Sequence, residues 1–162
     1  MIALTSYFPS TINRVESSTR PAVNSAIHEE MVNRVARVAA GGPVAIEQRL
    51  QELDNEWDIE RALETGAASL SLTTLALAAT VDKRWAFVTG AIAAFLLQHA
   101  LQGWCPPIVV FRRLGIRTEH EINVERLALR LLREDFRSGA HTPHAALSIA
   151  RAGYPTARDL SD

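Results

Sequence analysis

The sequence predicts an all-α protein built on a two-helix transmembrane hairpin with amphipathic cytoplasmic helices on either side. Residues 65–81 and 85–111 contain no Asp, Glu, Lys or Arg, and each stretch is about as long as a helix that crosses a bilayer. Outside them, apolar residues recur at helical spacing among charged ones. No segment shows the apolar and polar alternation typical of a strand.

The composition excludes several classes of function. With 162 residues and 48% apolar content, the chain can bury a core and is too apolar to be disordered. A formal net charge of -1 offers no basic excess for phosphates, so we expect no nucleic-acid partner. One cysteine and five histidines form no zinc motif, and phosphate-loop and nucleophile motifs are absent. We therefore expect no metal, no cofactor and no enzymatic activity.

The chain divides into four predicted segments. Residues 1–22 are expected to be a leader that is mobile or becomes ordered on contact, because Ser, Thr and Asn are abundant there and disfavour helix. Residues 23–60 form an amphipathic helical segment. Residues 61–105 form the transmembrane hairpin, and residues 106–162 form a cytoplasmic helical tail.

Amphipathic helices are predicted on both sides of the hairpin. Apolar residues recur every three or four positions over 23–40 and 46–57, with the breaker Gly41-Gly42-Pro43 between them. The same spacing predicts a helix over 122–136, and Thr142-Pro143 begins a short last helix. These runs have more apolar surface than one hairpin covers, so we expect a protein partner or a homo-oligomer in addition to the lipid bilayer.

The length of the hairpin fits a bilayer. Helical rise places Trp85 and Trp104 about 28 Å apart, close to the roughly 30 Å hydrocarbon thickness. Because indole rings favour membrane interfaces, the two tryptophans are expected to be anchors at opposite surfaces. Lys83 and Arg84 lie in the turn, and more arginines lie beyond the other helix ends. The positive-inside rule then predicts that both termini lie in the cytoplasm.

Small residues predict how the two helices pack. Helices in lipid associate through close contact of small side chains, and small or amide residues recur along one face of each stretch. These helix-packing residues are Gly66, Ser69, Thr73 and Ala76 on the first helix, and Ala86, Gly90, Ala94, Gln98 and Gln102 on the second. The two glutamines would bond to hydroxyls or carbonyls of the first helix. Leu70, Leu77, Ile92 and Leu96 would then face lipid.

Three positions are candidates for chemistry. His99 lies on another face of the second helix, so it is a candidate oligomer or ligand contact, or its ring simply tilts to the interface. Cys105 precedes two prolines near the predicted membrane surface; it is either a redox or sulfur-carrying thiol or a small buried residue at a helix end. His141 and His144 lack an accompanying carboxylate or thiol and are expected to be solvated.

The residues Gly103-Trp104-Cys105-Pro106, followed by Leu114-Gly115, resemble the two-helix inner-membrane domain of the YgaP-like family. In that family the hairpin ends in a Gly-x-Cys-Pro turn followed by Leu-Gly. The resemblance covers residues 58–118 and implies a multi-pass hairpin in the bacterial inner membrane. The best-known architecture joins this hairpin to a rhodanese domain that transfers sulfane sulfur. The sole cysteine here lies in the hairpin motif, so we expect a stand-alone member without a rhodanese domain.

Three hypotheses for the function remain open. The first is a membrane anchor or accessory subunit that binds a protein partner or itself. The second is a sulfur-relay or redox accessory protein that uses Cys105. The third is a soluble helical bundle of regulatory type, because the two uncharged stretches are rich in Ala, Ser and Thr.

Overall fold

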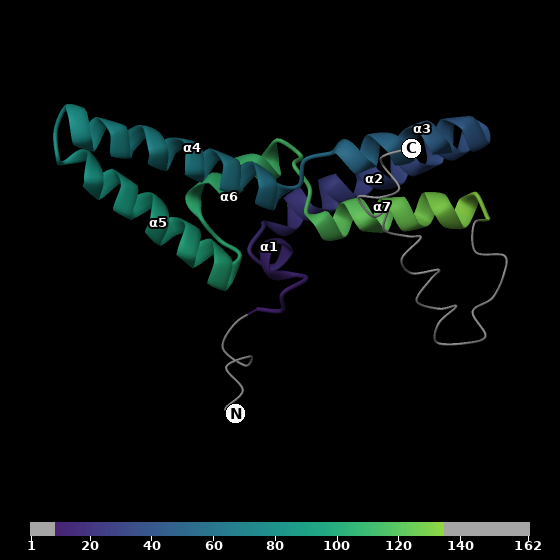
Figure 1. Cartoon of the computed structure of the whole chain (residues 1–162). Coiled ribbons are helices and arrows are strands. Elements are labelled where there is room, and N and C mark those ends of the chain that lie inside the picture. The colour runs from purple at the N-terminus through teal and green to yellow at the C-terminus, as the bar shows by residue number, and fades with distance from the viewer. Residues whose placement is uncertain (1–8, 135–162) are drawn as a thin grey trace, which may run out of the picture. The chain divides into compact units, whose positions relative to one another are not determined.

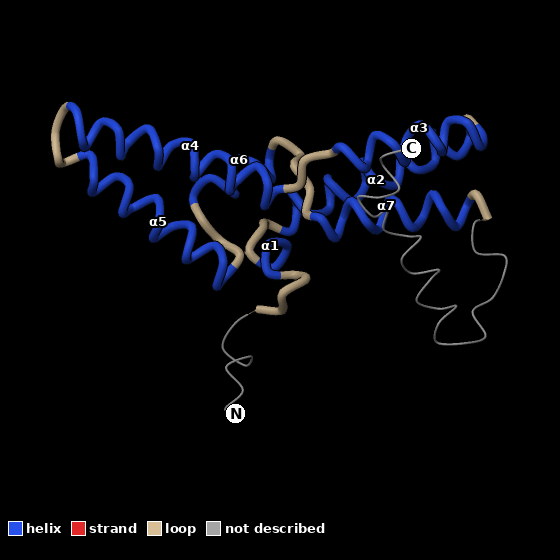
Figure 2. The backbone as a smooth tube through the Cα atoms, viewed as in Figure 1, coloured by secondary structure: helices blue, strands red, loops and turns tan. Residues whose placement is uncertain are grey.

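The computed structural model describes residues 9–134, and every regular element among them is an α-helix (Figures 1 and 2). The elements are α1 (Arg14–Ser17), α2 (Pro21–Ala40), α3 (Gly42–Asn55), α4 (Ile59–Thr80), α5 (Trp85–Gln102), α6 (Pro106–Arg113) and α7 (Glu119–Leu132). No strand occurs in this part of the chain, so the predicted all-α class is confirmed. The short helix expected from Thr142 lies outside the described residues, as do His141 and His144.

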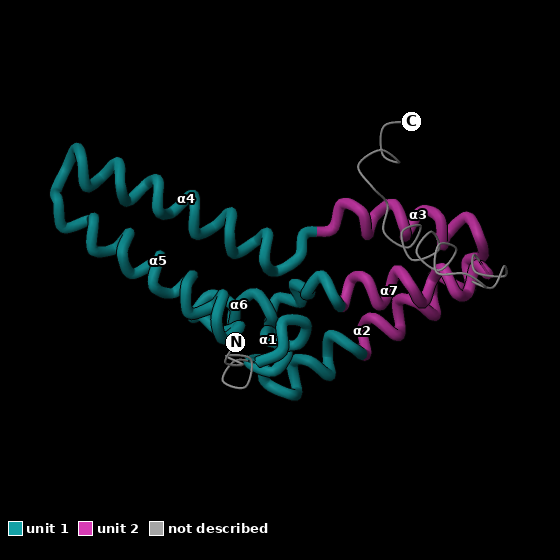
Figure 3. The backbone as a smooth tube through the Cα atoms, turned by 60° about the horizontal axis from the view of Figure 1, so that its bottom comes forward, with its two compact units in different colours: residues 1–28, 57–120 teal, residues 29–56, 121–162 magenta. Residues whose placement is uncertain are grey.

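The chain separates into two compact units, coloured separately in Figure 3. We call residues 1–28 and 57–120 the hairpin unit, because it contains α4 and α5. We call residues 29–56 and 121–162 the three-helix unit, because it contains the second half of α2 with α3 and α7. Helix α2 thus begins in one unit and ends in the other.

The three-helix unit buries the amphipathic seams that the sequence predicts. Its core consists of Ile46, Leu50, Leu53, Ile122 and Leu129, with Val35 and Val38 packed against it. The break at 41–43 is confirmed, since α2 ends at Ala40 and α3 begins at Gly42. Much of the apolar surface that led us to expect a partner is therefore covered within this unit.

Trp57 corrects one end of a predicted helix. Helix α3 ends at Asn55, two residues before the predicted end. Trp57 is exposed, and the Arg61 guanidinium stacks 4.5 Å from the centre of its ring. The amphipathic seam therefore does not extend to Trp57. Asp58 follows and begins α4, because its Oδ1 accepts a hydrogen bond from the Arg61 backbone N–H at 2.7 Å.

A buried carboxylate joins the helices of the three-helix unit. Glu125 of α7 is 0% exposed, and it accepts hydrogen bonds from Arg49 Nε at 2.8 Å and Arg34 Nη1 at 3.2 Å. Burial disfavours the charge of Arg49, but hydrogen bonds with Glu125 and Glu52 raise the pKa of the guanidinium above its ordinary value. One carboxylate from α7 thus pairs with one arginine from α2 and one from α3.

The hairpin unit contains the two helical segments that are long and apolar enough to cross a membrane. They are Gly42–Thr80, in which the uncharged part belongs to α4, and Trp85–Gln102, which is α5. Their apolar windows are only 11% and 6% buried inside the protein, whereas the core helix of a soluble bundle would be mostly buried. The outward residues are large: Leu72, Leu75, Phe87, Phe95, Leu97 and Leu101 are all exposed. This exposure favours the membrane hairpin over a soluble bundle.

Helix α6 begins directly after the predicted hairpin, in the segment predicted to be a helical tail. Two prolines in succession end the preceding helix, and here they are also the first residues of α6, with Cys105 as its N-cap. Proline suits a first helical turn, where its missing N–H has no intrahelical partner. Ile108 then packs with Ile59 and Leu63 in the core of the hairpin unit. The hairpin unit therefore continues past 105.

The described residues of the leader, 9–22, contain helix α1 and are ordered by contact with the hairpin. Val15 is buried in the same core cluster as Ile59 and Cys105. The Ser18 hydroxyl donates to the Gln102 carbonyl at 3.0 Å, and Arg14 pairs with Glu60 at 2.7 Å. Polar side chains of this segment bond to α4 and α5, so the segment packs on the hairpin.

Candidate functional site

The predicted helix-packing face of the hairpin lies on its outer surface. Among these residues, Gly66, Ser69, Thr73, Ala76, Ala86, Gly90, Ala94 and Gln102 are exposed, and Gln98 is half-buried. A Cβ atom added at Gly66 or Gly90 would meet no atom within 4 Å, so neither glycine marks a close helix contact. Gln102 does find a hydroxyl, but through its backbone carbonyl and from Ser18. The expected packing face is thus corrected.

Helices α4 and α5 contact each other through residues next in sequence to the predicted ones. Thr74 is 2% exposed, and its hydroxyl lies 2.7 Å from the hydroxyl of Thr89 on α5. Each hydroxyl also bonds to a carbonyl of its own helix. The physical reason is that a hydroxyl in hydrocarbon needs a partner more than a methyl group does. Polar pairing, and not small side-chain size, selects the inward face.

His99 is buried between the two helices, not on an outward face. It is 3% exposed, and its Nε2 lies 2.7 Å from Glu60 Oε2 in the first turn of α4. The other oxygen of Glu60 accepts a hydrogen bond from Arg14 Nη2 at 2.7 Å. A carboxylate held by an arginine accepts and does not donate, so Nε2 carries the proton in this contact. The expected outward contact of His99 with an oligomer is therefore corrected.

Cys105 lies next to this histidine. The thiol is buried, with 3% exposure, and it interacts with the His99 ring. With Nε2 donating to Glu60, Nδ1 of a neutral imidazole is the proton acceptor, and this atom is buried without a hydrogen-bond partner. Arg14, Glu60, His99 and Cys105 thus form a continuous row that we call the thiol site.

The thiol site opens on an apolar groove. A cavity of about 480 Å³ lies between α4, α5 and α6, and Cys105 is one of its lining residues. Its other walls are almost entirely apolar, with Leu63, Phe95, Pro107 and Phe111 among them. A molecule that reaches Cys105 through this groove crosses an apolar surface, so the groove selects against charged reagents.

Gly103 holds the site together through its backbone. Its φ of 72° is in the left-handed region and caps α5, and its N–H donates to the His99 carbonyl at 2.7 Å. A Cβ atom at this position would lie 2.3 Å from the Arg14 carbonyl oxygen. The glycine therefore turns the chain towards Cys105 and lets α1 approach α5 closely.

The two predicted membrane anchors lie at opposite ends of α5. Trp85 is its first residue, and Trp104 follows its C-cap. Both side chains are about four-tenths exposed, and the helix between them is about 27 Å long at 1.5 Å per residue. Their positions at the two membrane interfaces stay a prediction.

Sequence reasoning missed Arg14 and Glu60 as parts of the site. Glu60 lies in a run where acidic and basic residues alternate, a pattern typical of a solvated face. A signal was present: Glu60 precedes the apolar stretch by one turn, where an ionisable partner for His99 would have to lie in an antiparallel hairpin. Nothing in the leader's composition singles out Arg14.

No group of three or more His, Cys, Asp or Glu side chains that could hold a metal ion occurs in residues 9–134. The thiol site supplies one thiol, one imidazole and one carboxylate, but its carboxylate is already bound by Arg14 and its imidazole by that carboxylate. The site thus places a thiol beside an imidazole that a carboxylate orients.

Residues 54–121 match the family model described as "Inner membrane protein YgaP-like, transmembrane domain". The matched segment contains α4, α5 and α6, and so includes the helix that lies beyond the predicted end of the hairpin. No curated protein and no solved structure matches the chain.

Proposed function

With residues 54–121 identified as a YgaP-like inner-membrane domain, we propose that the chain is a non-enzymatic membrane anchor or accessory subunit. The supporting observation is the contrast between its two units. Helices α4 and α5 expose large apolar side chains along their length. The three-helix unit instead contains several ion pairs, such as Arg126 with Asp54 at 2.7 Å. The first unit suits lipid and the second suits water.

The charge distribution supports an orientation with both termini in the cytoplasm. The basic residues at the turn between α4 and α5 are Lys83 and Arg84. The opposite ends carry Arg61, Arg112, Arg113 and other arginines. Basic residues near membrane segments favour the cytoplasmic side, so in this proposal the three-helix unit also lies in the cytoplasm.

A second apolar stripe on α7 supports an accessory role. Val124, Leu127, Leu131 and Leu132 are 40–57% exposed, although the opposite stripe of the same helix is buried in the core. The four residues recur at helical spacing, so they form one continuous surface. Such a surface suits docking of another helix, from a second copy or from a partner protein.

We expect the full chain to sediment with membranes and to leave them only with detergent. In mild detergent, the wild type should have a mass above that of one chain in its micelle. Leu127→Glu with Leu131→Glu should return it to a single chain. Val44→Glu is the matched control, since Val44 is 71% exposed in the same unit but lies outside the stripe.

Analytical ultracentrifugation or mass photometry measures the mass of the wild type and of each variant in detergent. A wild type that stays in the supernatant without detergent contradicts the membrane anchor. A wild type that is a single chain with nothing bound contradicts the accessory role, as does an equal loss of mass in Val44→Glu.

A second candidate function is a sulfur-relay or redox accessory role for Cys105. The specific observation that favours it is the thiol site, in which an oriented imidazole lies beside the thiol. Imidazole bases activate thiols for nucleophilic attack. Here Glu60 would hold the ring in the tautomer that can accept the thiol proton, and Arg14 would hold Glu60.

In this role, Cys105 would receive the outer sulfur of a donor persulfide. His99 Nδ1 takes the Cys105 proton, and the thiolate attacks the outer sulfur of a donor persulfide, R–S–SH. The new bond joins Cys105 Sγ to that sulfur, and the donor S–S bond breaks. The leaving thiolate R–S⁻ receives a proton from the imidazolium. No oxidant or reductant is consumed. The donor reaches Cys105 through the apolar groove, so a small and uncharged persulfide fits best.

We expect an uncharged alkylating reagent such as N-ethylmaleimide to modify Cys105 much faster than a charged thiosulfonate of similar size. His99→Gln should slow the alkylation at neutral pH by about 100-fold, the low end of the effect of a general base. Cys105→Ser should remove both alkylation and persulfide labelling while membrane insertion is retained. Mass spectrometry of the full chain in detergent measures each rate.

Glu60→Gln provides the matched test of positioning. It keeps the size of the side chain but lets the amide present an N–H to the imidazole, so it should reduce the rate and flatten its dependence on pH. If His99→Gln alkylates as fast as the wild type across the pH range, Cys105 is only a small buried residue of the core.

A further inference from the structure

The apolar groove beside Cys105 is elongated along the hairpin. Its volume of about 480 Å³ lies within the range of roughly 300–1,000 Å³ that is typical of ligand sites. Its lining extends from Leu63 to Leu70 on α4 and from Val88 to Leu96 on α5, which is about 10–12 Å along each helix. Cys105 packs in the same cluster as Leu63, so the thiol lies towards one end of the groove.

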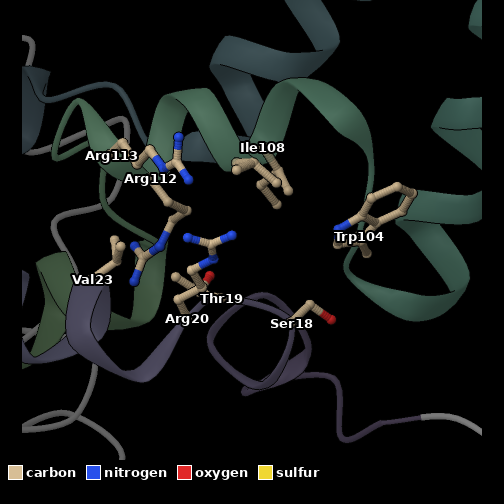
Figure 4. A pocket seen from close by; sticks show the side chains of 9 residues that line it. Ser18, Thr19, Arg20, Val23, Trp104, Ile108, Arg112 and Arg113 are labelled. Atoms are coloured by element: carbon tan, nitrogen blue, oxygen red, sulfur yellow. The ribbon is translucent and has the colours of Figure 1, made fainter.

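The charged side chains of α6 do not line this groove. Arg112 and Arg113 line a separate, smaller pocket on another side of the helix (Figure 4). The wall that α6 contributes to the groove consists of its two initial prolines and Phe111, and no charged residue belongs to the lining that the structure describes. An occupant of the groove is therefore uncharged and apolar along its length.

Small residues leave space within the groove. Gly66, Ala67 and Ala91 belong to its lining, and a Cβ atom added at Gly66 would meet no atom within 4 Å. Large side chains lie beside them, and Leu70 and Phe95 are 52% and 43% exposed. The core of a bilayer contains no water, so between two membrane-spanning helices a hydrocarbon chain would fill this space.

The polar groups of the thiol site lie at one end of the groove. His99 is 3% exposed, and its Nε2 is bound to Glu60 at 2.7 Å. Its Nδ1 is buried without a hydrogen-bond partner, and the ring interacts with the Cys105 thiol. An imidazole beside a thiol is an arrangement that activates the sulfur as a nucleophile. The matching ligand has an electrophilic carbon at one end and an apolar chain behind it.

We propose that Cys105 is a site of S-acylation, and that the hydrocarbon chain of the attached acyl group lies in the apolar groove. The donor is a long-chain acyl thioester, R–CO–S–R′. The Cys105 proton passes to His99 Nδ1, and the thiolate attacks the carbonyl carbon. The new bond joins that carbon to Cys105 Sγ, the donor C–S bond breaks, and the leaving thiolate R′–S⁻ takes the proton from the imidazolium. One thioester replaces another, so no oxidant or reductant is consumed.

The depth of Cys105 in the hairpin suits this donor. Cys105 follows Trp104, and indole rings favour the interface of a bilayer. The groove extends from there along α4 and α5, so a chain that enters it has its carbonyl near the interface and its methyl end deeper. This site depends on the proposed membrane anchor, since the groove meets hydrocarbon only where the hairpin crosses a bilayer. An acyl group on Sγ would also block the persulfide transfer considered above.

The test uses the full chain in phosphatidylcholine vesicles with two uncharged donors, the dodecanoyl and acetyl thioesters of N-acetylcysteamine. Intact-mass spectrometry should find one dodecanoyl group on the wild type and none on Cys105→Ser, which lacks the only cysteine. Neutral hydroxylamine, which cleaves thioesters, should remove it. His99→Gln should slow transfer from both donors, because the imidazole acts at the thiol and not on the chain.

Gly66→Leu tests whether the chain occupies the groove. The new side chain would take the space of about two buried methylene groups, so dodecanoyl transfer should slow about tenfold more than acetyl transfer. Gly90→Leu is the matched control. Gly90 also has open space around a Cβ atom but lies outside the groove lining, so both transfers should proceed as in the wild type. Each variant meets the same donors in the same vesicles, so partitioning of the donors into lipid cancels.

Equal slowing of the two donors by Gly66→Leu would indicate a disturbed thiol and overturns the proposal, as does a dodecanoyl group that persists on Cys105→Ser or in hydroxylamine. Flotation of the chain with the vesicles is measured in parallel. A wild type that floats with the vesicles but accepts no dodecanoyl group contradicts S-acylation alone. A wild type that accepts the group but does not float contradicts the membrane anchor.

Discussion

Gly103→Ala is expected to destabilise the hairpin unit by about 2–5 kcal/mol. The left-handed φ of 72° costs about 1–2 kcal/mol for a residue with a Cβ atom. The new methyl group would also lie 2.3 Å from the Arg14 carbonyl oxygen and 2.8 Å from the Val15 backbone nitrogen. Backbone atoms cannot move aside alone, so α1 must shift away, at an overpacking cost of about 1–3 kcal/mol.

The thermal unfolding midpoint of the full chain in detergent, followed by tryptophan fluorescence, measures this loss. Trp104 is the neighbour of Gly103, so its emission reports on the same region. The expected decrease is about 4–8 °C for each kcal/mol lost, if the unit behaves as a small domain. The backbone at Arg14 and Val15 should also become more accessible to protease, because the new methyl group displaces it.

Gly115→Ala is the matched control. Gly115 also has a positive φ, at 82°, but a Cβ atom there would meet nothing within 4 Å. It should therefore cost only the conformational term, about 1–2 kcal/mol. If both variants unfold at the same temperature, the close approach of α1 to Gly103 does not contribute to stability, and the glycine serves only as a helix cap.

The helices could be predicted from sequence because their signals are local. The breaker at 41–43 and the spacing of apolar residues need no knowledge of the partner element, and both proved correct. Helix α6 was missed although its signal is also local: Pro106 at a helix start and Ile108 one turn before Arg112. The prolines were interpreted only as the end of the preceding helix, whereas they also begin the next one.

The thiol site could not be assembled from sequence, because its members come from four separate elements. Arg14 belongs to α1, Glu60 to α4, His99 to α5, and Cys105 to the N-cap of α6. Each residue alone has an ordinary explanation. Only the burial of His99 and its 2.7 Å contact with Glu60 distinguish the arrangement from a solvated charge run and an interfacial ring.

The packing of the hairpin shows why composition misled us about its inner face. Alanine and glycine can lie on either face of a helix in lipid, because lipid and protein solvate a methyl group alike. Thr74, Thr89 and His99 have no such freedom, since an unpaired polar group in hydrocarbon costs several kcal/mol. The better predictor of the inward face is the row of polar residues, and the small residues only permit the approach.

Glu125→Ala is expected to destabilise the three-helix unit by about 3–5 kcal/mol. Glu125 is fully buried and holds Arg49 at 2.8 Å and Arg34 at 3.2 Å. Removing the carboxylate leaves two arginines without their central counter-ion, one of them 13% exposed. Loss of one member of a buried ion pair typically costs this much. Glu52 and Glu56 still pair with Arg49 in this variant, so we expect a value near the lower end of the range.

Hydrogen exchange of α3 and α7 peptides in the full chain measures the loss of stability within the three-helix unit, without requiring the hairpin unit to unfold. A loss of 3 kcal/mol would speed exchange roughly 100-fold or more, since each 1.4 kcal/mol is a factor of ten. Glu52→Ala is the matched control: Glu52 also pairs with Arg49, at 2.9 Å, but is 65% exposed, so it should cost less than about 1 kcal/mol. Equal acceleration in both variants would mean that Arg49 is stabilised by total acidic charge. A large effect of Glu125 alone would establish that one buried carboxylate, and not the apolar seam by itself, fixes how α2, α3 and α7 align.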